Sequence, residues 1–171
     1  MRHLALHDPL TGLANRILLT ERLDRALVTG AAGTVGVVVL DLDGFKIVND
    51  AWGHDEGDLL LVEIARRLVA VTGPGDTVAR LGGDEFVVVH HALTDPTESG
   101  SCAERIRRAV AQPYGQAADA PYDRITASIG TAVSTDGCTS RSLINRADQA
   151  MYDAKRAGRL DLRGRAARSA R

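Results

Sequence analysis

The sequence predicts an α/β domain in which a sheet is flanked by helices. The first observation is a set of short apolar runs typical of strands, at residues 34–40, 77–79, 86–89 and 125–133. The second is a set of segments with apolar residues at helical spacing, at residues 17–28, 59–71, 102–111 and 140–157. Because the two kinds of segment alternate along the chain, we expect a layered α/β fold.

The composition is that of one globular domain. The chain has 171 residues, of which 44% are hydrophobic and 25% charged, and its net charge is −1. This near-neutral balance argues against a nucleic-acid partner, and no apolar run approaches the roughly twenty residues of a membrane helix. With no secretory signal and only two isolated cysteines, we expect a cytoplasmic protein without direct membrane insertion.

Turn residues mark the ends of the expected elements. The Gly-Pro-Gly at residues 73–75 ends the second helix, and Gly158 ends the last one. Residues 112–123 are polar and turn-rich, and we expect a loop or a short edge strand there. We divide the chain into one domain at residues 1–160 and a basic tail at residues 161–171, which lacks apolar periodicity and is expected to be disordered.

The most informative segment lies between two expected strands. It places two adjacent carboxylates, Asp84 and Glu85, behind Gly82 and Gly83. Such a segment predicts a tight hairpin, and its glycines allow a ligand to approach the backbone closely. Two acids at such a tip are well placed to hold a cation, although an ordinary glycine-rich turn with solvated acids would have the same pattern.

A second acidic segment follows the first apolar run. Asp41 and Asp43 stand at the end of this buried strand, at the edge of the sheet. We expect these two side chains to point to opposite faces, so that only one shares a site with Asp84. An EF-hand calcium loop is excluded, because Lys46 and Trp52 stand where it needs glycine and glutamate. A P-loop is also excluded, because the chain has no Gly-Lys-Ser/Thr.

Lysine is rare in this chain. Of 21 lysine and arginine residues, only Lys46 and Lys155 are lysine. A compact ammonium where the composition otherwise supplies a flat guanidinium favours phosphate binding at these two positions. Two chance occurrences would give the same count.

The ordered motifs of the chain resemble one known family, the GGDEF domains of diguanylate cyclases. The motifs are Asp8-Pro9-Leu10-Thr11-Gly12-Leu13-Ala14-Asn15-Arg16, Asp41-Leu42-Asp43-Gly44-Phe45-Lys46-Ile47-Val48-Asn49-Asp50, Gly53-His54-Asp55-Glu56-Gly57-Asp58, Gly82-Gly83-Asp84-Glu85-Phe86, Ser128-Ile129-Gly130 and Ala147-Asp148-Gln149-Ala150-Met151-Tyr152-Asp153-Ala154-Lys155. The resemblance implies a central, mainly antiparallel sheet flanked by helices, similar to the palm of nucleotide polymerases and nucleotide cyclases. It also implies a reaction, the condensation of two GTP into cyclic di-GMP with release of two pyrophosphates.

The resemblance further implies a metal site. Its ligands would be Asp41, the backbone carbonyl of Leu42, Asp84 and Glu85, and these hard oxygen donors favour Mg²⁺ or Mn²⁺ over zinc. By the same resemblance Asp84, Glu85 and Lys46 take part in catalysis, and Asp84 is the suggested proton acceptor.

Nucleotide binding is implied for five residues. Asn49 and Asp58 would read guanine, His54 would line the nucleotide site, and Lys155 and Arg159 would bind phosphates. A carboxylate at Asp58 can accept from two N–H groups on the edge of guanine, a pair of donors that adenine lacks. Structural roles stay open: Asp58 could complement a helix dipole, His54 could be an ordinary loop residue, and the two basic residues could form a solvated helix end.

We expect purely structural roles for three neighbouring residues. Asp43 and Asp50 are expected in helix capping or local backbone hydrogen bonds. Arg80 is expected to orient the hairpin rather than to contact substrate.

The chain departs from the family pattern at a regulatory position. Many members carry an inhibitory product site, Arg-x-x-Asp, shortly before the signature. Here Asp76 is present but Gly73 replaces the arginine, so the main bidentate contact to a cyclic dinucleotide is lost. We therefore expect no strong product inhibition through this site.

The implied partners are GTP, a second copy of the domain and a sensor domain in a longer parent protein. Each domain of this family holds one GTP, so turnover needs two copies face to face. Two alternatives stay open. A GTP-binding regulatory domain without activity is disfavoured by the intact signature, and a cyclase that uses ATP is disfavoured by Asp58.

Overall fold

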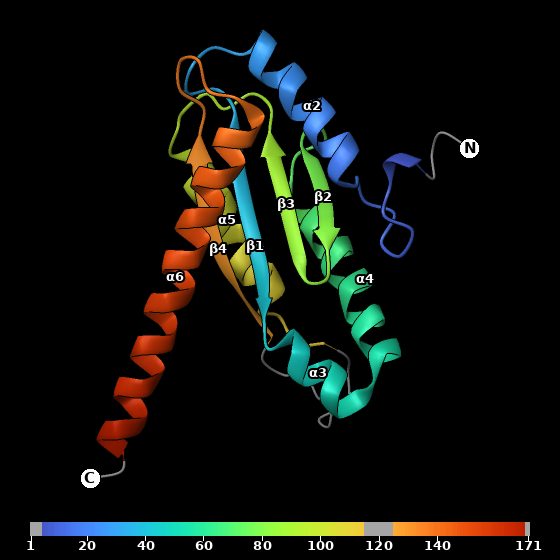
Figure 1. Cartoon of the computed structure of the whole chain (residues 1–171), viewed down its shortest axis with the longest axis vertical. Helices are drawn as coiled ribbons and strands as arrows, with labels where there is room; N and C mark the ends of the chain where they lie inside the picture. Colours follow the sequence, from blue (N-terminus) through green and yellow to red (C-terminus); the bar gives the residue numbers. More distant parts are fainter. Residues whose placement is uncertain (1–4, 115–124, 170–171) are drawn as a thin grey trace.

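The computed structural model describes the backbone of residues 5–114 and 125–169, and their side chains up to residue 157. The elements in chain order are α2 (Arg16–Thr29), β1 (Gly36–Asp43), α3 (Phe45–Trp52), α4 (His54–Val71), β2 (Thr77–Gly82), β3 (Glu85–His90), α5 (Glu98–Val110), β4 (Thr126–Val133) and α6 (Ser140–Ser169). The strands form one sheet in the order β2-β3-β1-β4, and all neighbouring strands are antiparallel. The predicted antiparallel sheet flanked by helices is confirmed (Figure 1).

Helices cover both faces of this sheet. Figure 1 shows α2 and α6 in front of the sheet and α4 and α5 behind it. Each face has its own apolar cluster, the rear one around Phe86 and the front one around Leu23 and Leu143, and these three side chains are fully buried. The sheet is therefore covered on both sides along its apolar length.

Alternation along β1 assigns its residues to the two faces. Val38, Leu40 and Leu42 belong to the rear cluster, whereas Val37 and Val39 belong to the front cluster. Because side chains on one face recur every second residue, the acids that end β1 continue the front series, on the side of α6.

Glycine allows α6 to pack directly on β4. A β-carbon at Gly130 would collide with the backbone of Ala147 and Met151 on α6. Gly130 therefore fixes the depth at which α6 lies on the sheet, and with it the position of Lys155 further along the helix.

The helices differ from those expected at several points, including the start of α5 at Glu98, four residues before the expected start. The sequence analysis did not predict α3, a short helix that buries only Val48, and α4 begins at His54, five residues before the expected start. The expected helix end at Gly158 is wrong, because α6 continues to Ser169. Each of the two glycines in this part of α6, Gly158 and Gly164, costs only about 1 kcal/mol relative to alanine, and helix-forming arginine, alanine and leucine residues surround both.

The remaining expectations concern the tail and one loop. Residues 161–169, expected to be disordered, have a helical backbone. Most of the loop expected at residues 112–123 lies outside the described residues. In the described part of the chain, no helix combines the length and apolar character needed to cross a membrane.

Candidate active site

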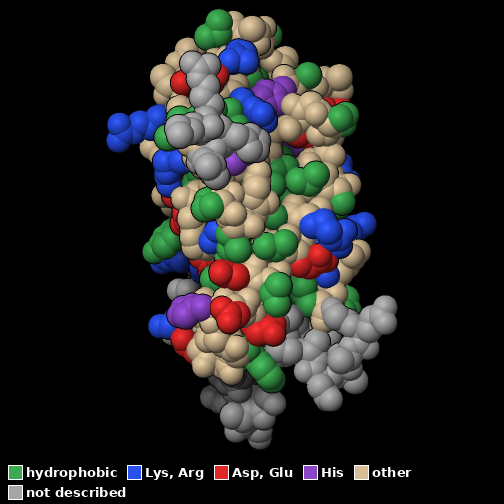
Figure 2. Space-filling model, turned by 90° about the vertical axis from the view of Figure 1, so that its right-hand side faces the viewer, with side chains coloured by type: hydrophobic (Ala, Val, Ile, Leu, Met, Phe, Trp, Pro, Cys, Tyr) green, Lys and Arg blue, Asp and Glu red, His purple; other side chains and the backbone are tan. Residues whose placement is uncertain are grey.

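The sheet brings the four residues predicted as metal ligands together. Asp41 near the end of β1 is the direct antiparallel partner of Glu85 on β3, and the Leu42 amide donates to the Asp84 carbonyl at 3.3 Å. Residues that lie more than forty positions apart in the sequence thus meet at one end of the sheet. Figure 2 shows acidic side chains in the lower half of the molecule, towards the end at which α3 lies.

One expectation about these acids is wrong. Asp41 and Asp43 are two residues apart in a strand, so they lie on the same face rather than on opposite faces. Both flank the region of Lys155: Asp41 contacts it, and Asp43 lines the same cleft as Lys155 and Asp84.

The signature turn is held by glycine conformation and by one arginine. Gly82 and Gly83 adopt φ values of 137° and 52°, which residues with a β-carbon rarely adopt. The Arg80 guanidinium donates to the Gly83 carbonyl from Nε at 3.0 Å and from Nη2 at 2.9 Å. The expectation that Arg80 orients the hairpin is confirmed.

Arg80 also ties the turn to the N-terminal segment. Its Nη1 donates to both carboxylate oxygens of Asp8 at 3.1 Å, and the Arg80 and Asp8 side chains are only 11% and 16% exposed. Asp8 in turn accepts from the amide and hydroxyl of Thr11. Burial opposes ionisation, but the bonds from Thr11 and Arg80 outweigh it and lower the pKa of Asp8.

Negative charge accumulates at the tip of the hairpin. Burial raises the pKa of Asp84, and the nearby charge of Asp41 adds to the effect. Burial and the charge of Asp41 likewise raise the pKa of Glu85, with further contributions from Asp148 and Asp84. A cation bound here would relieve this repulsion.

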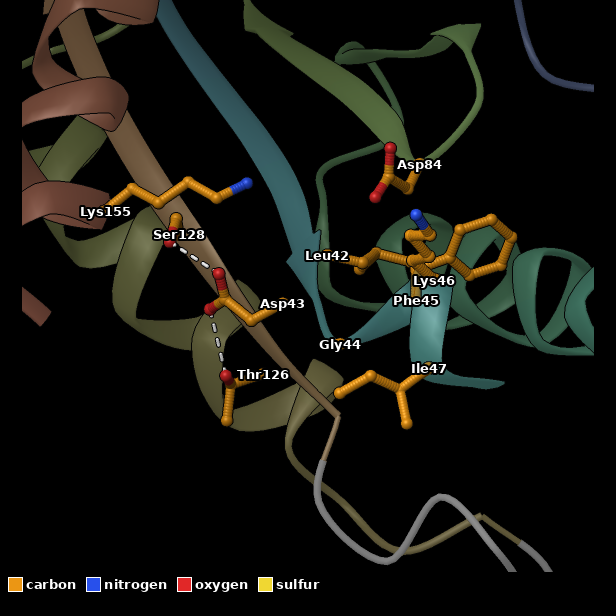
Figure 3. Close-up of a pocket in the computed structure, with 10 residues that line it drawn as sticks. All are labelled: Leu42, Asp43, Gly44, Phe45, Lys46, Ile47, Asp84, Thr126, Ser128 and Lys155. Atoms are coloured by element: carbon orange, nitrogen blue, oxygen red, sulfur yellow. Dashed lines mark hydrogen bonds between the residues drawn. The ribbon is translucent and has the colours of Figure 1, made fainter. Parts of the chain in front are cut away.

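A cleft of about 610 Å³ opens beside these acids, a volume within the usual range of ligand pockets. Both lysines of the chain line it, together with Asp84 and Ile47. Lys155 reaches from α6 towards β1 (Figure 3), where its Nζ donates to Oδ1 of Asp41. The sequence indicates phosphate contacts for both lysines but carries no local signal for this ion pair.

Sequence reasoning also missed the partners of Asp43. Its two carboxylate oxygens accept from the hydroxyl of Ser128 at 2.8 Å and from that of Thr126 at 3.0 Å (Figure 3). The expected capping role is wrong, because the residue that caps α3 is Gly44, which has no side chain to donate or accept. The alternation of polar Thr126 and Ser128 with apolar neighbours was the signal that could have indicated these partners.

The predicted guanine-reading residues lie on α3 and α4. Asn49 on α3 packs so closely against Gly57 on α4 that a β-carbon at Gly57 would collide with its amide. The assigned Oδ1 of Asn49 is buried without a hydrogen-bond partner among the described residues. His54 and Asp58 are exposed on α4.

The structure does not bring all predicted nucleotide contacts into one cleft. Asn49, His54 and Asp58 do not line the 610 Å³ cleft, although Phe45 lines it and also lies against the Asn49–Gly57 contact. Arg159 belongs to α6, but its side chain lies outside the described residues.

The donor set is compatible with a magnesium-type ion. Within the described residues, no three acidic, histidine or cysteine side chains converge as a metal shell of their own. Mg²⁺ is commonly held by one or two carboxylates, with water and substrate phosphates as the other ligands. The carboxylates of Asp41, Asp84 and Glu85 and the Leu42 carbonyl offer such a partial set, so the residues fit the ion.

Comparison with known proteins agrees with this fold. A family model described as the diguanylate cyclase GGDEF domain matches residues 5–161. The solved structure of the coiled coil and GGDEF domain of DgcB from Caulobacter crescentus, in complex with c-di-GMP, matches with a TM-score of 0.82 and 33% identity, over 92% of this chain and 84% of that one. The chain belongs to the GGDEF diguanylate cyclase domain family.

The similar full-length proteins are longer. The chain is 47% identical over 159 residues to the bifunctional diguanylate cyclase/cyclic di-GMP phosphodiesterase MucR of Pseudomonas aeruginosa. This match covers 91% of this chain and 23% of MucR. It is 40% identical over 170 residues to the response regulator PleD of Caulobacter vibrioides, over 96% of this chain and 37% of PleD. The chain thus corresponds to one part of longer signalling proteins.

Proposed function

We propose that this chain is an active diguanylate cyclase domain, which joins two GTP into cyclic di-GMP and releases two pyrophosphates. The observation that carries the proposal is the intact signature hairpin, which holds Asp84 and Glu85 beside Asp41, with Asp84 lining the 610 Å³ cleft. Loss of one of these acids would be expected in a domain that had become purely regulatory.

The proposed reaction forms two phosphodiester bonds. The 3′-hydroxyl oxygen of one GTP attacks the α-phosphorus of the other, the bond to the bridging oxygen of pyrophosphate breaks, and the hydroxyl proton passes to an acceptor, for which Asp84 is the candidate. The same step in the opposite sense closes the ring. Such transfers depend mainly on positioning and charge neutralisation.

Asp41, Asp84, Glu85 and the Leu42 carbonyl are the residues that would hold Mg²⁺ or Mn²⁺. An ion bound there supplies charge neutralisation at the triphosphate and acidifies the attacking hydroxyl. The pKa values of Asp84 and Glu85 are raised first by burial and then by the charge of Asp41. This supports the assignment, because a bound cation would relieve the repulsion between these carboxylates.

Lys46, Lys155 and Arg159 are the proposed phosphate contacts, and Asn49, Asp58 and His54 the proposed contacts to the nucleoside. The exposed carboxylate of Asp58 supports a role in base recognition, because it is open to a ligand. The assigned Oδ1 of Asn49 is buried against Gly57, so the role proposed for Asn49 rests on the family motif.

We further propose that turnover requires a second copy of the chain, because one domain holds one GTP. A sensor domain in a longer parent protein would bring the copies together. The share of MucR and PleD that the chain covers supports this arrangement.

The test is an incubation with GTP and Mg²⁺ at high protein concentration, with products identified by mass spectrometry. We expect cyclic di-GMP from the wild type and none from Asp84→Ala. A rate that rises with the square of protein concentration would indicate that encounter of two copies is limiting. Bound GTP without product at any concentration would contradict the cyclase and favour the regulatory alternative.

A further inference from the structure

An ion pair between Lys155 and Asp41 joins α6 to the metal site proposed above, on which its interpretation rests. Lys155 Nζ donates to Oδ1 of Asp41, across 114 residues of sequence. Both side chains are largely covered, with 26% of Lys155 and 15% of Asp41 exposed. The α6 ammonium therefore lies on the carboxylate that the family resemblance assigns to the metal.

We propose that Lys155 is a positioning residue with two states. In the metal-free protein its ammonium occupies the metal-binding oxygen of Asp41, and when a divalent cation binds it moves to the nucleotide phosphates. An ammonium and a divalent cation both bind carboxylate oxygens, and the two repel each other at one carboxylate. Lys155 must therefore leave Oδ1 of Asp41 for a cation to bind there tightly.

The triphosphate gives the displaced ammonium a new partner. Lys155 and Asp84 line the same cleft, so a nucleotide bound in that cleft would lie close to the lysine. Metal without nucleotide must displace Lys155 into solvent, whereas metal with nucleotide displaces it onto phosphate. The two ligands consequently bind with positive coupling, and each strengthens the other by the same factor.

Lys46 provides a matched contrast. It lines the same cleft and carries the same charge, but it forms no ion pair with any residue that the structure describes. Removal of Lys46 tests the effect of one less positive charge near the acids, and removal of Lys155 tests that effect plus the loss of the direct contact to Asp41.

The experiment measures Mn²⁺ binding to the folded chain by electron paramagnetic resonance, without nucleotide and with a non-hydrolysable GTP analogue. For Lys155→Met we expect nucleotide-free Mn²⁺ affinity to rise by about fivefold or more, because a partly buried competing charge is lost. For Lys46→Met we expect a rise of less than about twofold, since a solvated charge is largely screened. Lys155→Arg should weaken Mn²⁺ binding, because a guanidinium can hold Asp41 with two hydrogen bonds.

The coupling is the second readout. The analogue should tighten Mn²⁺ binding strongly in the wild type and much less in Lys155→Met. Equal affinities for Lys155→Met and Lys46→Met, or undiminished coupling in Lys155→Met, would overturn the exchange while leaving the metal site intact. Mn²⁺ binding that is insensitive to Asp84→Ala would overturn the metal site as well. Thermal unfolding of each variant establishes that it is folded.

Discussion

The β2–β3 hairpin has an aspartate at each end, and the two carboxylates differ in the partners that the fold gives them. Asp76, at the open end, accepts from the Gly73 amide at 2.8 Å and lies 3.0 Å from Nδ1 of the buried His90. Asp84, at the turn, has no hydrogen bond from another side chain within the described residues, and burial and the charge of Asp41 raise its pKa.

The difference separates a structural acid from one that needs a ligand. The carboxylate of Asp76 is only 15% exposed and already has its partners inside the fold, so it has little capacity for an external one. Asp84 lies in an acidic cluster that the fold leaves only partly neutralised. A bound cation and nucleotide would give the carboxylate at the turn its partners, whereas the carboxylate at the open end already has them inside the fold.

The largest expected effect comes from replacing each of these two acids by alanine. Asp84→Ala should lower kcat/KM for cyclic di-GMP formation by about 10³-fold or more while changing stability little. Asp76→Ala should lower the free energy of unfolding by about 2 kcal/mol, because it leaves His90 buried without its partner. Activity assays and urea unfolding on both variants measure this, and a large activity loss in folded Asp76→Ala would break the comparison.

The next effect concerns the arginine that holds the turn. Arg80→Lys keeps the charge but loses the fork that joins Gly83 and Asp8, so we expect a fall in kcat of about 10- to 100-fold from misplaced acids. The matched control is Arg66→Lys, an exposed arginine paired with Glu63 on α4, for which no change is expected. A double-mutant cycle with Asp8→Asn should give a coupling of about 1 kcal/mol or more; additive effects would argue against the tie.

Substrate selectivity would show how far the ligand-binding end extends towards α4. In Asp58→Ser the preference for GTP over ATP should fall by about tenfold or more, because the acceptor for two guanine donors is lost. Asp55→Ser, an exposed acid in the first turn of the same helix, is the control. Unchanged selectivity in Asp58→Ser would place base recognition elsewhere.

At the open end of the hairpin we expect only a small effect of cyclic di-GMP on the reaction rate. Added cyclic di-GMP should leave the initial rate within about twofold, because Gly73 offers no guanidinium and Asp76 is already paired. Isothermal titration and inhibition assays measure this. Submicromolar inhibition that Asp76→Ala abolishes would show that this end also binds a ligand.

The smallest effect is on pH-dependent stability. The pKa values of Asp84 and Glu85 are raised from ordinary values of 3.8 and 4.5, so the folded state binds more protons than the unfolded state just above these values. Stability of the metal-free protein should therefore fall as pH rises through that window. Asp84→Asn should be more stable at neutral pH by about 0.5 kcal/mol, with the advantage shrinking in acid; an unchanged pH profile in urea unfolding would contradict this.

Local pattern was enough to predict the hairpin and most of the helices and strands. Two glycines between apolar runs specify a turn, and the acids behind them are carried to its tip. The face shared by Asp41 and Asp43 follows from the two-residue period of a strand, and here the period was misapplied. The α3 helix was missed because it is short and buries only Val48.

Contacts between distant elements could not be predicted. The ion pair of Lys155 with Asp41 depends on how deeply α6 packs on β4 at Gly130. The hydroxyl contacts to Asp43 depend on the register between β1 and β4, in which Asp43 faces Thr126 and Asp41 faces Ser128. Neither the docking depth nor the register is visible in local sequence.

The most direct test of the contrast between the two hairpin ends is amide hydrogen exchange, followed by mass spectrometry, with and without Mg²⁺ and a non-hydrolysable GTP analogue. We expect slower exchange at residues 41–50 and 80–86, and unchanged exchange at residues 72–77. Protection at residues 72–77 without protection at the turn would contradict this expectation.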